Sequence, residues 1–352
     1  MELSGLQITL LSLLIGVVLF LPLTVHKVEE NLEAFLFVCG LTAVTVSGVW
    51  EWHLVQTALK DPIKITVAVF VAGLLFKQFN HHLQKITQRA VKLIGLRWTL
   101  FLIVVILGLS SSIITAIVAA LILAEITVML PLEKAGRIKL IVFCCYAIGM
   151  GAVLTSIGEP LGTIVISKLK GPPHNATFFY LIEHVGWFVL GGVLFMAGLA
   201  SSIREGTIQH APGARAVETG DDHSVKGIAV RAGKVYLFVM ALTFLGDGLK
   251  PLAMQTISHL NAGWLYWINM LSAVLDNATL AAIEITPSIA DRTLVFLLMS
   301  LIVSGGMLIP GNIPNIICAS KLGIKSKEWM KTAFGLGLVL LIAYFVILSA
   351  VM

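Results

Sequence analysis

The amino-acid sequence predicts an all-α polytopic membrane protein with about eight transmembrane spans and two re-entrant hairpins. Three observations predict it: an apolar composition, apolar runs long enough to span a bilayer, and polar clusters that interrupt some of these runs. Of the 352 residues, 58% are hydrophobic and only 12% are charged, whereas an average soluble domain has about 25% charged residues. This composition cannot cover a globular surface with polar groups, so we expect contact with membrane lipid.

Apolar runs of spanning length occur along the whole chain. A bilayer core of about 30 Å needs about 20 apolar helical residues. Eight runs approach or exceed that length, and they are residues 6–24, 32–50, 64–79, 139–169, 177–201, 230–250, 294–322 and 329–352. Two further runs, 97–130 and 263–287, carry polar clusters at their centres. We predict that each of these two runs enters the membrane and returns as a hairpin.

The positions of the basic residues orient the spans. If both termini lie outside, 18 of the 24 Lys and Arg residues fall in inner segments. Cytoplasmic loops carry an excess of Lys and Arg, so the N- and C-termini are predicted to lie outside the inner (plasma) membrane. The net charge of +5 is then loop charge, and we expect no nucleic-acid partner.

The chain contains a predicted internal repeat. Shifted by 162 positions, the pattern of small and polar residues at 110–120 matches that at 272–282, and shifted by 153, 158–169 matches 311–322. The domains follow as scaffold spans 1–63, repeat 1 at 64–203, a cytoplasmic connector at 204–229 and repeat 2 at 230–352. Each repeat has three crossings, which makes the second inverted relative to the first. Inverted repeats with broken helices are typical of secondary transporters.

The runs 139–169 and 294–322 are both predicted to break in the middle. Glycine and proline lie at each break, with Gly158 and Pro160 in the first and Pro310 and Gly311 in the second. Proline removes a backbone donor and glycine permits unusual dihedral angles. Backbone of this kind is tolerated at membrane depth where it is buried in protein or lines a water-filled cavity.

Two carboxylates are predicted to lie deepest in the membrane: Glu159 at the first break and Asp276 at the tip of the second hairpin. A charge at the bilayer centre costs about 2.5–3.5 kcal/mol on insertion scales, and such residues mark ion or proton pathways. Burial raises a carboxylate pKa and a bound cation lowers it. One carboxylate can therefore hold either a proton or Na⁺, which makes Asp276 and Glu159 the candidate exchange sites. For either carboxylate, a hydrogen-bonded packing role is the alternative.

Neutral oxygens and backbone groups complete the predicted cation site. They come from the two hairpins and the two breaks: Ser110, Thr115, Gly158, Ser272, Asn277, Gly311, Asn312 and Asn315. Each hydroxyl or amide alone is also explained as a helix cap. Glu125 and Glu284 lie about one to two turns from the ends of the returning hairpin arms, and we treat them as rim residues with a relay role as the functional alternative.

Roughly residues 64–352 resemble a known superfamily. The motifs are Asp276-Asn277-Ala278-Thr279 and Gly311-Asn312-Ile313-Pro314-Asn315, and together with the hairpin and broken-helix order they are similar to the ion transporter superfamily, in particular to NhaD-type sodium/proton antiporters and a small branch of cation transporters. In the related dicarboxylate carriers, a Ser-Asn-Thr triplet at each hairpin tip holds substrate carboxylates. That triplet is absent here, so the resemblance implies a cation as the transported species.

The sequence therefore predicts a secondary active transporter that exchanges sodium for protons by alternating access. It is predicted to be no enzyme and to use no cofactor besides the transported Na⁺ and H⁺. A homodimer through the scaffold is the expected assembly. Two alternatives stay open: a sodium-coupled symporter of a small anion or organic acid, and an intramembrane aspartyl protease that would use Asp247 and Asp276.

Overall fold

The structure is a computed structural model that describes residues 3–25, 27–28, 31–204, 225–257, 262–274 and 277–352. Throughout these ranges the secondary structure is helical, without a β-strand. Six helical segments of the described residues are long and apolar enough to cross a membrane: Gly5–Pro22, Lys85–Ile114, Lys134–Ala152, Tyr180–Ser201, Val225–Gln255 and Ser326–Val351. The prediction of an α-helical, multi-pass membrane protein is confirmed at this level, and the count of eight spans stays a prediction.

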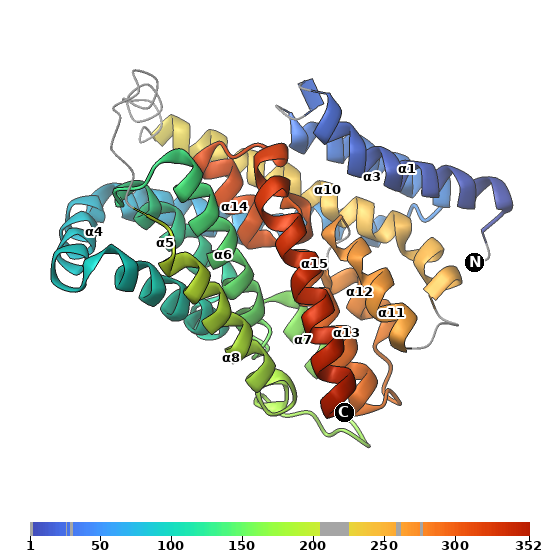
Figure 1. Cartoon of the computed structure of the whole chain (residues 1–352). Helices are drawn as coiled ribbons and strands as arrows, with labels where there is room; N and C mark the ends of the chain where they lie inside the picture. Colours follow the sequence, from blue (N-terminus) through green and yellow to red (C-terminus); the bar gives the residue numbers. More distant parts are fainter. Residues whose placement is uncertain (1–2, 26, 29–30, 205–224, 258–261, 275–276) are drawn as a thin grey trace.

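The N-terminal helices pack beside a helix from the second half of the chain. Helices α1 (Gly5–Thr24) and α3 (Leu32–Ser47) lie side by side, and α3 packs along α10 (Val225–Ile257) (Figure 1). Small residues allow this close approach. A Cβ atom on Gly40 would lie 2.8 Å from the carbonyl oxygen of Ala241, and one on Gly248 would lie 2.6 Å from Cβ of Ala43.

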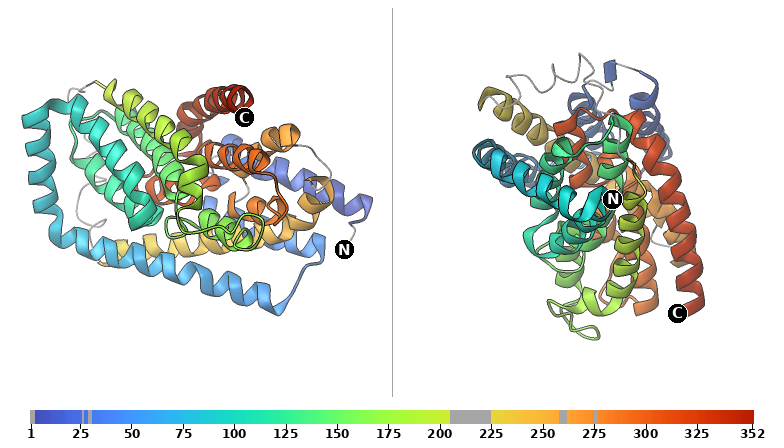
Figure 2. Two further views of the ribbon diagram at one scale, coloured as in Figure 1. Left: turned by 90° about the horizontal axis from the view of Figure 1, so that it is seen from below. Right: turned by 60° about the vertical axis from the view of Figure 1, so that its left-hand side comes forward.

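Helix α4 differs from the prediction. It runs without interruption from Trp52 to Ile114, except at Gly95, whose φ of 77° is non-helical. The predicted span at 64–79 and the loop after it are parts of this one helix. Figure 2 shows α4 running along one side of the molecule, bending and turning back towards α6. The sequence between residue 63 and Gly95 contains no proline, so nothing local ends the helix before that glycine.

The remaining elements of the first half follow the predicted order. Thr115 separates α4 from α5 (Ala116–Met129), which makes the predicted first hairpin. Helix α6 (Lys134–Ala152) and the short α7 (Pro160–Lys168) form the predicted broken span, and α8 (Tyr180–Ser201) follows.

The second half has a similar series of elements. Helix α11 (Ala262–Ile268), the 3₁₀ helix η1 (Asn269–Ala273) and α12 (Asn277–Glu284) cover the predicted second hairpin. Helices α13 (Asp291–Gly305) and α14 (Ile313–Leu322), with the 3₁₀ turn η2 (Ile309–Gly311) between them, form the second broken span. Helix α15 (Ser326–Val351) ends the chain.

The two halves interlock at the centre of the molecule. Helix α14 packs on α5, and α7 packs on α12, so the short arm of each broken helix contacts the hairpin of the other half. The long arms α6 and α13 are the most buried helices of the series, with α13 buried continuously from Leu294 to Gly305. A helix that is apolar and buried on all sides belongs to the core, so both long arms lie in the core. The second break is also buried, whereas Ile157 in the first break is 54% exposed.

Candidate functional site

The first break lies between Ala152, the last residue of α6, and Pro160, the first residue of α7. Glu159 is the N-cap of α7, with extended dihedral angles of φ −156° and ψ 164°. Its side chain is buried, at 6% exposure. Proline suits the first position of a helix because the backbone donor that it lacks has no partner there in any helix. The break therefore holds a carboxylate at a buried helix N-terminus.

The second break has the same local geometry. Asn312 is the N-cap of α14, with φ −154° and ψ 147°, and it is 5% exposed. Asn312 lies 153 positions after Glu159, which is the repeat distance predicted for the broken spans. The two N-cap residues have nearly the same backbone conformation, and one is an acid where the other is an amide.

Glycine is required at both breaks by close contacts. A Cβ atom at Gly158 would overlap the carbonyl oxygen of Ala152, and one at Gly311 would overlap the carbonyl oxygen of Gly305. In both cases the carbonyl belongs to the residue six positions earlier, at the end of the long arm. Only glycine lets the chain fold back this closely.

The first hairpin is joined to the first break by hydrogen bonds. The backbone N–H of Ala116 donates to the carbonyl oxygen of Gly158 at 2.9 Å, and the Thr155 hydroxyl donates to the carbonyl oxygen of Ser112 at 2.5 Å. Thr115 has a left-handed φ of 75°, and its side chain accepts a hydrogen bond from the N–H of Val118. The predicted site residues Thr115 and Gly158 are therefore close to each other in the structure.

The second hairpin meets the second break in a comparable way. A Cβ atom at Gly311 would lie 2.9 Å from the carbonyl oxygen of Ser272. The Ser272 hydroxyl donates to the carbonyl oxygen of Leu301 at 3.2 Å, and the Ser111 hydroxyl donates to that of Ile148 at 3.0 Å. Ser111, rather than the predicted Ser110, thus has the environment of Ser272, which corrects the hairpin offset from 162 to 161 positions.

The second break packs against the long arm of the first broken helix. A Cβ atom at Gly149 of α6 would lie 2.7 Å from Nδ2 of Asn312, so this amide packs on α6. A Cβ atom at Gly306 would likewise overlap the ring of Tyr146. Small residues at these crossings allow the second unwound segment to approach α6 closely.

Asn315 satisfies part of the unwound backbone at the second break. Its Nδ2 donates to the carbonyl oxygens of Gly305 at 2.8 Å and Leu308 at 2.9 Å. The corresponding residue of the first half is Gly162, whose Cβ atom would lie 2.5 Å from the carbonyl oxygen of Thr155. Asn315 is thus a binding partner of the protein's own backbone, and only its Oδ1 is left to face a ligand.

Several buried polar atoms at the hairpins and breaks have no hydrogen-bond partner among the described residues. Among the predicted neutral site residues, these atoms are Ser110 Oγ, Asn277 Nδ2 and Asn315 Oδ1. Most buried polar side-chain atoms in proteins are hydrogen-bonded to protein or water. Two of these three atoms carry lone pairs, so the region has oxygen atoms that suit a hard cation.

Glu125 is not a rim residue, contrary to the prediction. It is 4% exposed and forms a buried ion pair with Lys321 of α14. In the other half, Nζ of Lys168 on α7 donates to the carbonyl oxygens of Ala282 and Ile285 near the end of α12. The predicted repeat pairs Lys168 with Lys321, and the structure shows that each lysine contacts the hairpin of the opposite half.

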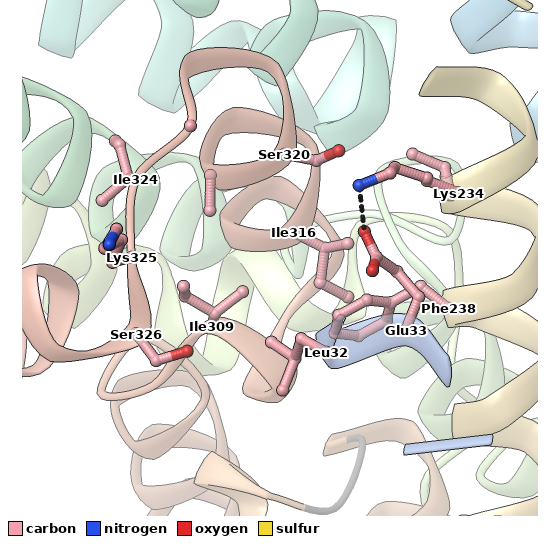
Figure 3. Close-up of a pocket in the computed structure, with 13 residues that line it drawn as sticks. Leu32, Glu33, Lys234, Phe238, Ile309, Ile316, Ser320, Ile324, Lys325 and Ser326 are labelled. Atoms are coloured by element: carbon pink, nitrogen blue, oxygen red, sulfur yellow. Dashed lines mark ion pairs between the residues drawn. The ribbon is translucent and has the colours of Figure 1, made fainter. Parts of the chain in front are cut away.

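A cavity of about 220 Å³ reaches the second break (Figure 3). Its lining includes Ile309 of η2, Ile316 and Ser320 of α14, and an ion pair of 3.7 Å between Glu33 of α3 and Lys234 of α10. The sequence analysis assigned the N-terminal helices to a scaffold and missed Glu33. The one available signal was an acid in the first turn of a predicted span.

The alternative of an intramembrane aspartyl protease names Asp247 and Asp276. Asp276 is outside the described residues. Asp247 of α10 lines a separate cavity of about 620 Å³ together with Glu51, His53 and Lys250.

Comparison with known proteins assigns a family and no activity. No curated protein matches the chain. A family model described as "Protein of unknown function (DUF1646)" matches residues 8–351, which is nearly the whole sequence. The match covers the scaffold, both hairpins and both breaks, so the chain belongs to this family.

Proposed function

We propose that this protein is a secondary active cation transporter that exchanges sodium for protons. The observation that carries the proposal is the pair of broken helices, whose N-cap residues Glu159 and Asn312 share one backbone geometry and are both buried. Broken helices at a repeat interface are where secondary transporters hold their substrates and coupling ions.

The two halves are proposed to be inverted repeats. Paired contacts support this: the glycine packing at Gly158 and Gly311, and the serine hydrogen bonds of Ser111 and Ser272. With the hairpin offset of 161, Thr115 of the first tip pairs in sequence with Asp276 of the second. Each half would then place one carboxylate near the centre, Glu159 from its break in the first and Asp276 from its hairpin in the second.

Exchange follows from the chemistry of a buried carboxylate. With Na⁺ bound, the carboxylate stays ionised, and without it the same group takes up a proton. Glu159 puts its negative charge at the N-terminus of α7, where the helix dipole favours an anion. Neutral oxygens such as Ser110 Oγ and Asn315 Oδ1 would complete the coordination of the ion.

The cavity next to Ile309 is the proposed route from the inner side. Its lining includes Lys325 and Lys234, which both fall in inner segments under the predicted topology. Glu33 and Lys234 would lie along the path of the ion. We propose the inner (plasma) membrane as the location, with both termini outside and with α1 and α3 as the contact of a homodimer.

A sodium-coupled symporter of an organic acid is the second candidate. The observation that favours it is that both α7 and α14 begin at the breaks, because helix N-termini bind anions. Against it, the N-cap of α7 is Glu159, whose own charge would repel a carboxylate substrate. Transport of labelled carboxylates at neutral pH separates the two functions.

The test is sodium-dependent proton flux in proteoliposomes. Asp276→Asn and Glu159→Gln are each expected to reduce the flux at least tenfold, because neither amide can exchange a proton for an ion. Glu183→Gln, which alters an exposed acid at the start of α8, serves as the matched control and is expected to keep full flux. Full flux in both Asp276→Asn and Glu159→Gln would refute the exchange mechanism.

A further inference from the structure

We propose that Glu284, which accepts a hydrogen bond from Asn269 that is itself bonded to Ser300, is a proton-binding site without a counterpart in the first half of the molecule. The inference rests on the proposed function for its role in exchange, and on the structure alone for the binding of a proton. The three residues come from three elements, α12, η1 and α13. Asn269 and Ser300 are fully buried, at 0% exposure.

The side chains of Glu284, Asn269 and Ser300 have more hydrogen-bond acceptors than donors. Nδ2 of Asn269 donates to Oε2 of Glu284 at 3.1 Å and to Oγ of Ser300 at 2.9 Å. The Ser300 hydroxyl donates to the carbonyl oxygen of Leu297 at 2.9 Å. The side-chain donors of Asn269 and Ser300 are thus all used, two within the trio and one on the backbone.

Two buried oxygens are left over. Oε1 of Glu284 and Oδ1 of Asn269 have no hydrogen-bond partner among the described residues. An ionised carboxylate is an acceptor only, whereas a protonated one gains an O–H donor. A buried acceptor without a donor costs about 1–3 kcal/mol. Addition of one proton to Glu284 removes its negative charge and supplies the missing donor.

The first half has no counterpart of the trio. With the offsets of 161 for the hairpins and 153 for the broken spans, Asn269, Glu284 and Ser300 correspond to Gly108, Leu123 and Ala147. A Cβ atom at Gly108 would lie 3.1 Å from Cβ of Ala147, so the same pair of positions is in contact in both halves. The contact is apolar in the first half and a hydrogen bond in the second. The trio is therefore not needed to hold a hairpin against its broken helix.

The charges around Glu284 come from the elements that pack on α12. These elements are α7, α10, α13 and η1. Helix α7 contributes Lys168, whose Nζ binds the carbonyl oxygens of Ala282 and Ile285 on either side of Glu284 in the sequence. The last turns of α10 contain Asp247 and Lys250, α13 begins with Asp291 and Arg292, and η1 has no titratable residue.

The trio is displaced from the second break along helix α13. Ser300 is five residues before Gly305 on α13, which is about 7.5 Å along a helix. It is displaced towards Asp291, on the outer side in the predicted topology. A proton held there would be next to the second break and outside the proposed sodium site. This position fits a site that takes up or releases protons on the outer side.

Infrared difference spectroscopy of the full-length protein in detergent tests proton binding without any transport assay. Titration from acid to alkaline pH is expected to remove the C=O stretching band of a protonated, buried carboxyl group. In Glu284→Gln that band is expected to lose the part that Glu284 contributes, with the parts from Glu159 and Asp276 remaining, and in Glu183→Gln it is expected to be unchanged. Asn269→Ala, which removes the partner and keeps the acid, is expected to retain the band with a shifted titration midpoint. An unchanged band in Glu284→Gln would overturn the proposal.

A flux measurement separates this inference from the proposed function. If Glu284→Gln loses its part of the band and wild-type protein shows no sodium-dependent proton flux, the proton site stands and the antiport function fails. If wild-type protein exchanges sodium for protons while Glu284→Gln retains both the whole band and the full pH dependence of flux, the antiport function stands and the proton site fails.

Discussion

Lys168 and Lys321 end the short arms of the two broken helices, and each contacts the hairpin of the other half. Lys321 neutralises Glu125 in a buried ion pair, with exposures of 15% and 6% for the two side chains, whereas Lys168 binds two backbone carbonyl oxygens. A lysine at the end of the short arm therefore makes a contact between the two halves whether or not the opposite hairpin carries an acid.

Removal of Lys321 alone is expected to destabilise the protein strongly. Lys321→Met leaves the buried Glu125 carboxylate without its cation, and the loss of one partner from a buried pair costs about 3–5 kcal/mol. The double variant Glu125→Leu/Lys321→Met is expected to recover most of this loss because no buried charge is left. Thermal unfolding in detergent measures both. If the double variant is no more stable than the single one, the ion pair is not the cause.

Glu125 also shows which properties of a single residue the sequence does not predict. Its position on the hairpin arm was predictable from the spacing after Thr115, and its partner was not, because Lys321 lies 196 positions away. The same holds for Glu284. Nothing in the sequence marks Asn269 or Ser300 as its neighbours, since an isolated polar residue in an apolar run predicts neither depth nor direction.

The two breaks are the elements on which the account depends. Each consists of a long arm, an unwound segment with one required glycine, and a short arm capped by Glu159 or Asn312. Glycine and proline in apolar runs predicted both breaks correctly, because these residues act on the local backbone. The turn at Thr115 was predicted in a different way, from a cluster of hydroxyl residues.

Substitution of either break glycine by alanine is expected to destabilise the protein. Gly158→Ala and Gly311→Ala each force a Cβ atom onto a backbone carbonyl oxygen, and overpacking of this kind costs about 1–3 kcal/mol. Gly198→Ala on α8 is the control, since a Cβ atom there would meet nothing within 4 Å. The melting temperature in detergent should fall for the first two variants and stay or rise for the third. Equal melting temperatures would contradict the close packing.

Helix α4 shows why local signals mislead for long elements. Basic and polar residues after position 76 predicted a loop, yet a helix accommodates such residues wherever solvent or headgroups can reach them. The break in its helical conformation comes only at Gly95. Charge clusters predict the side of the membrane better than they predict the end of a helix.

At the scale of the whole molecule, the halves interlock through swapped contacts, α14 on α5 and α7 on α12. The repeat offsets predicted that the halves would be similar, and they could not predict which elements would meet across the boundary. That choice depends on the packing of small residues, such as Gly149 against Asn312, which emerges only when the chain is folded.

A covalent link across the cavity is expected to stop transport. Glu33 and Lys234 come from α3 and α10 and approach within 3.7 Å at the cavity lining. A short bis-maleimide that joins Glu33→Cys to Lys234→Cys should abolish exchange in proteoliposomes, because it holds scaffold helix α3 against α10 of the second half and obstructs the cavity proposed as the route of the ion. Each single cysteine variant treated with the same reagent is the control. Full exchange in the linked protein would show that α3 and α10 do not move apart.

The most direct test of sodium/proton antiport is sodium uptake driven by a pH gradient. Wild-type protein is reconstituted into vesicles with an acidic interior and given radioactive sodium outside. The account predicts that protons leaving the vesicles drive sodium in above its external concentration, with no other solute present. Sodium accumulation that requires an added organic acid, or no accumulation at all, would contradict it.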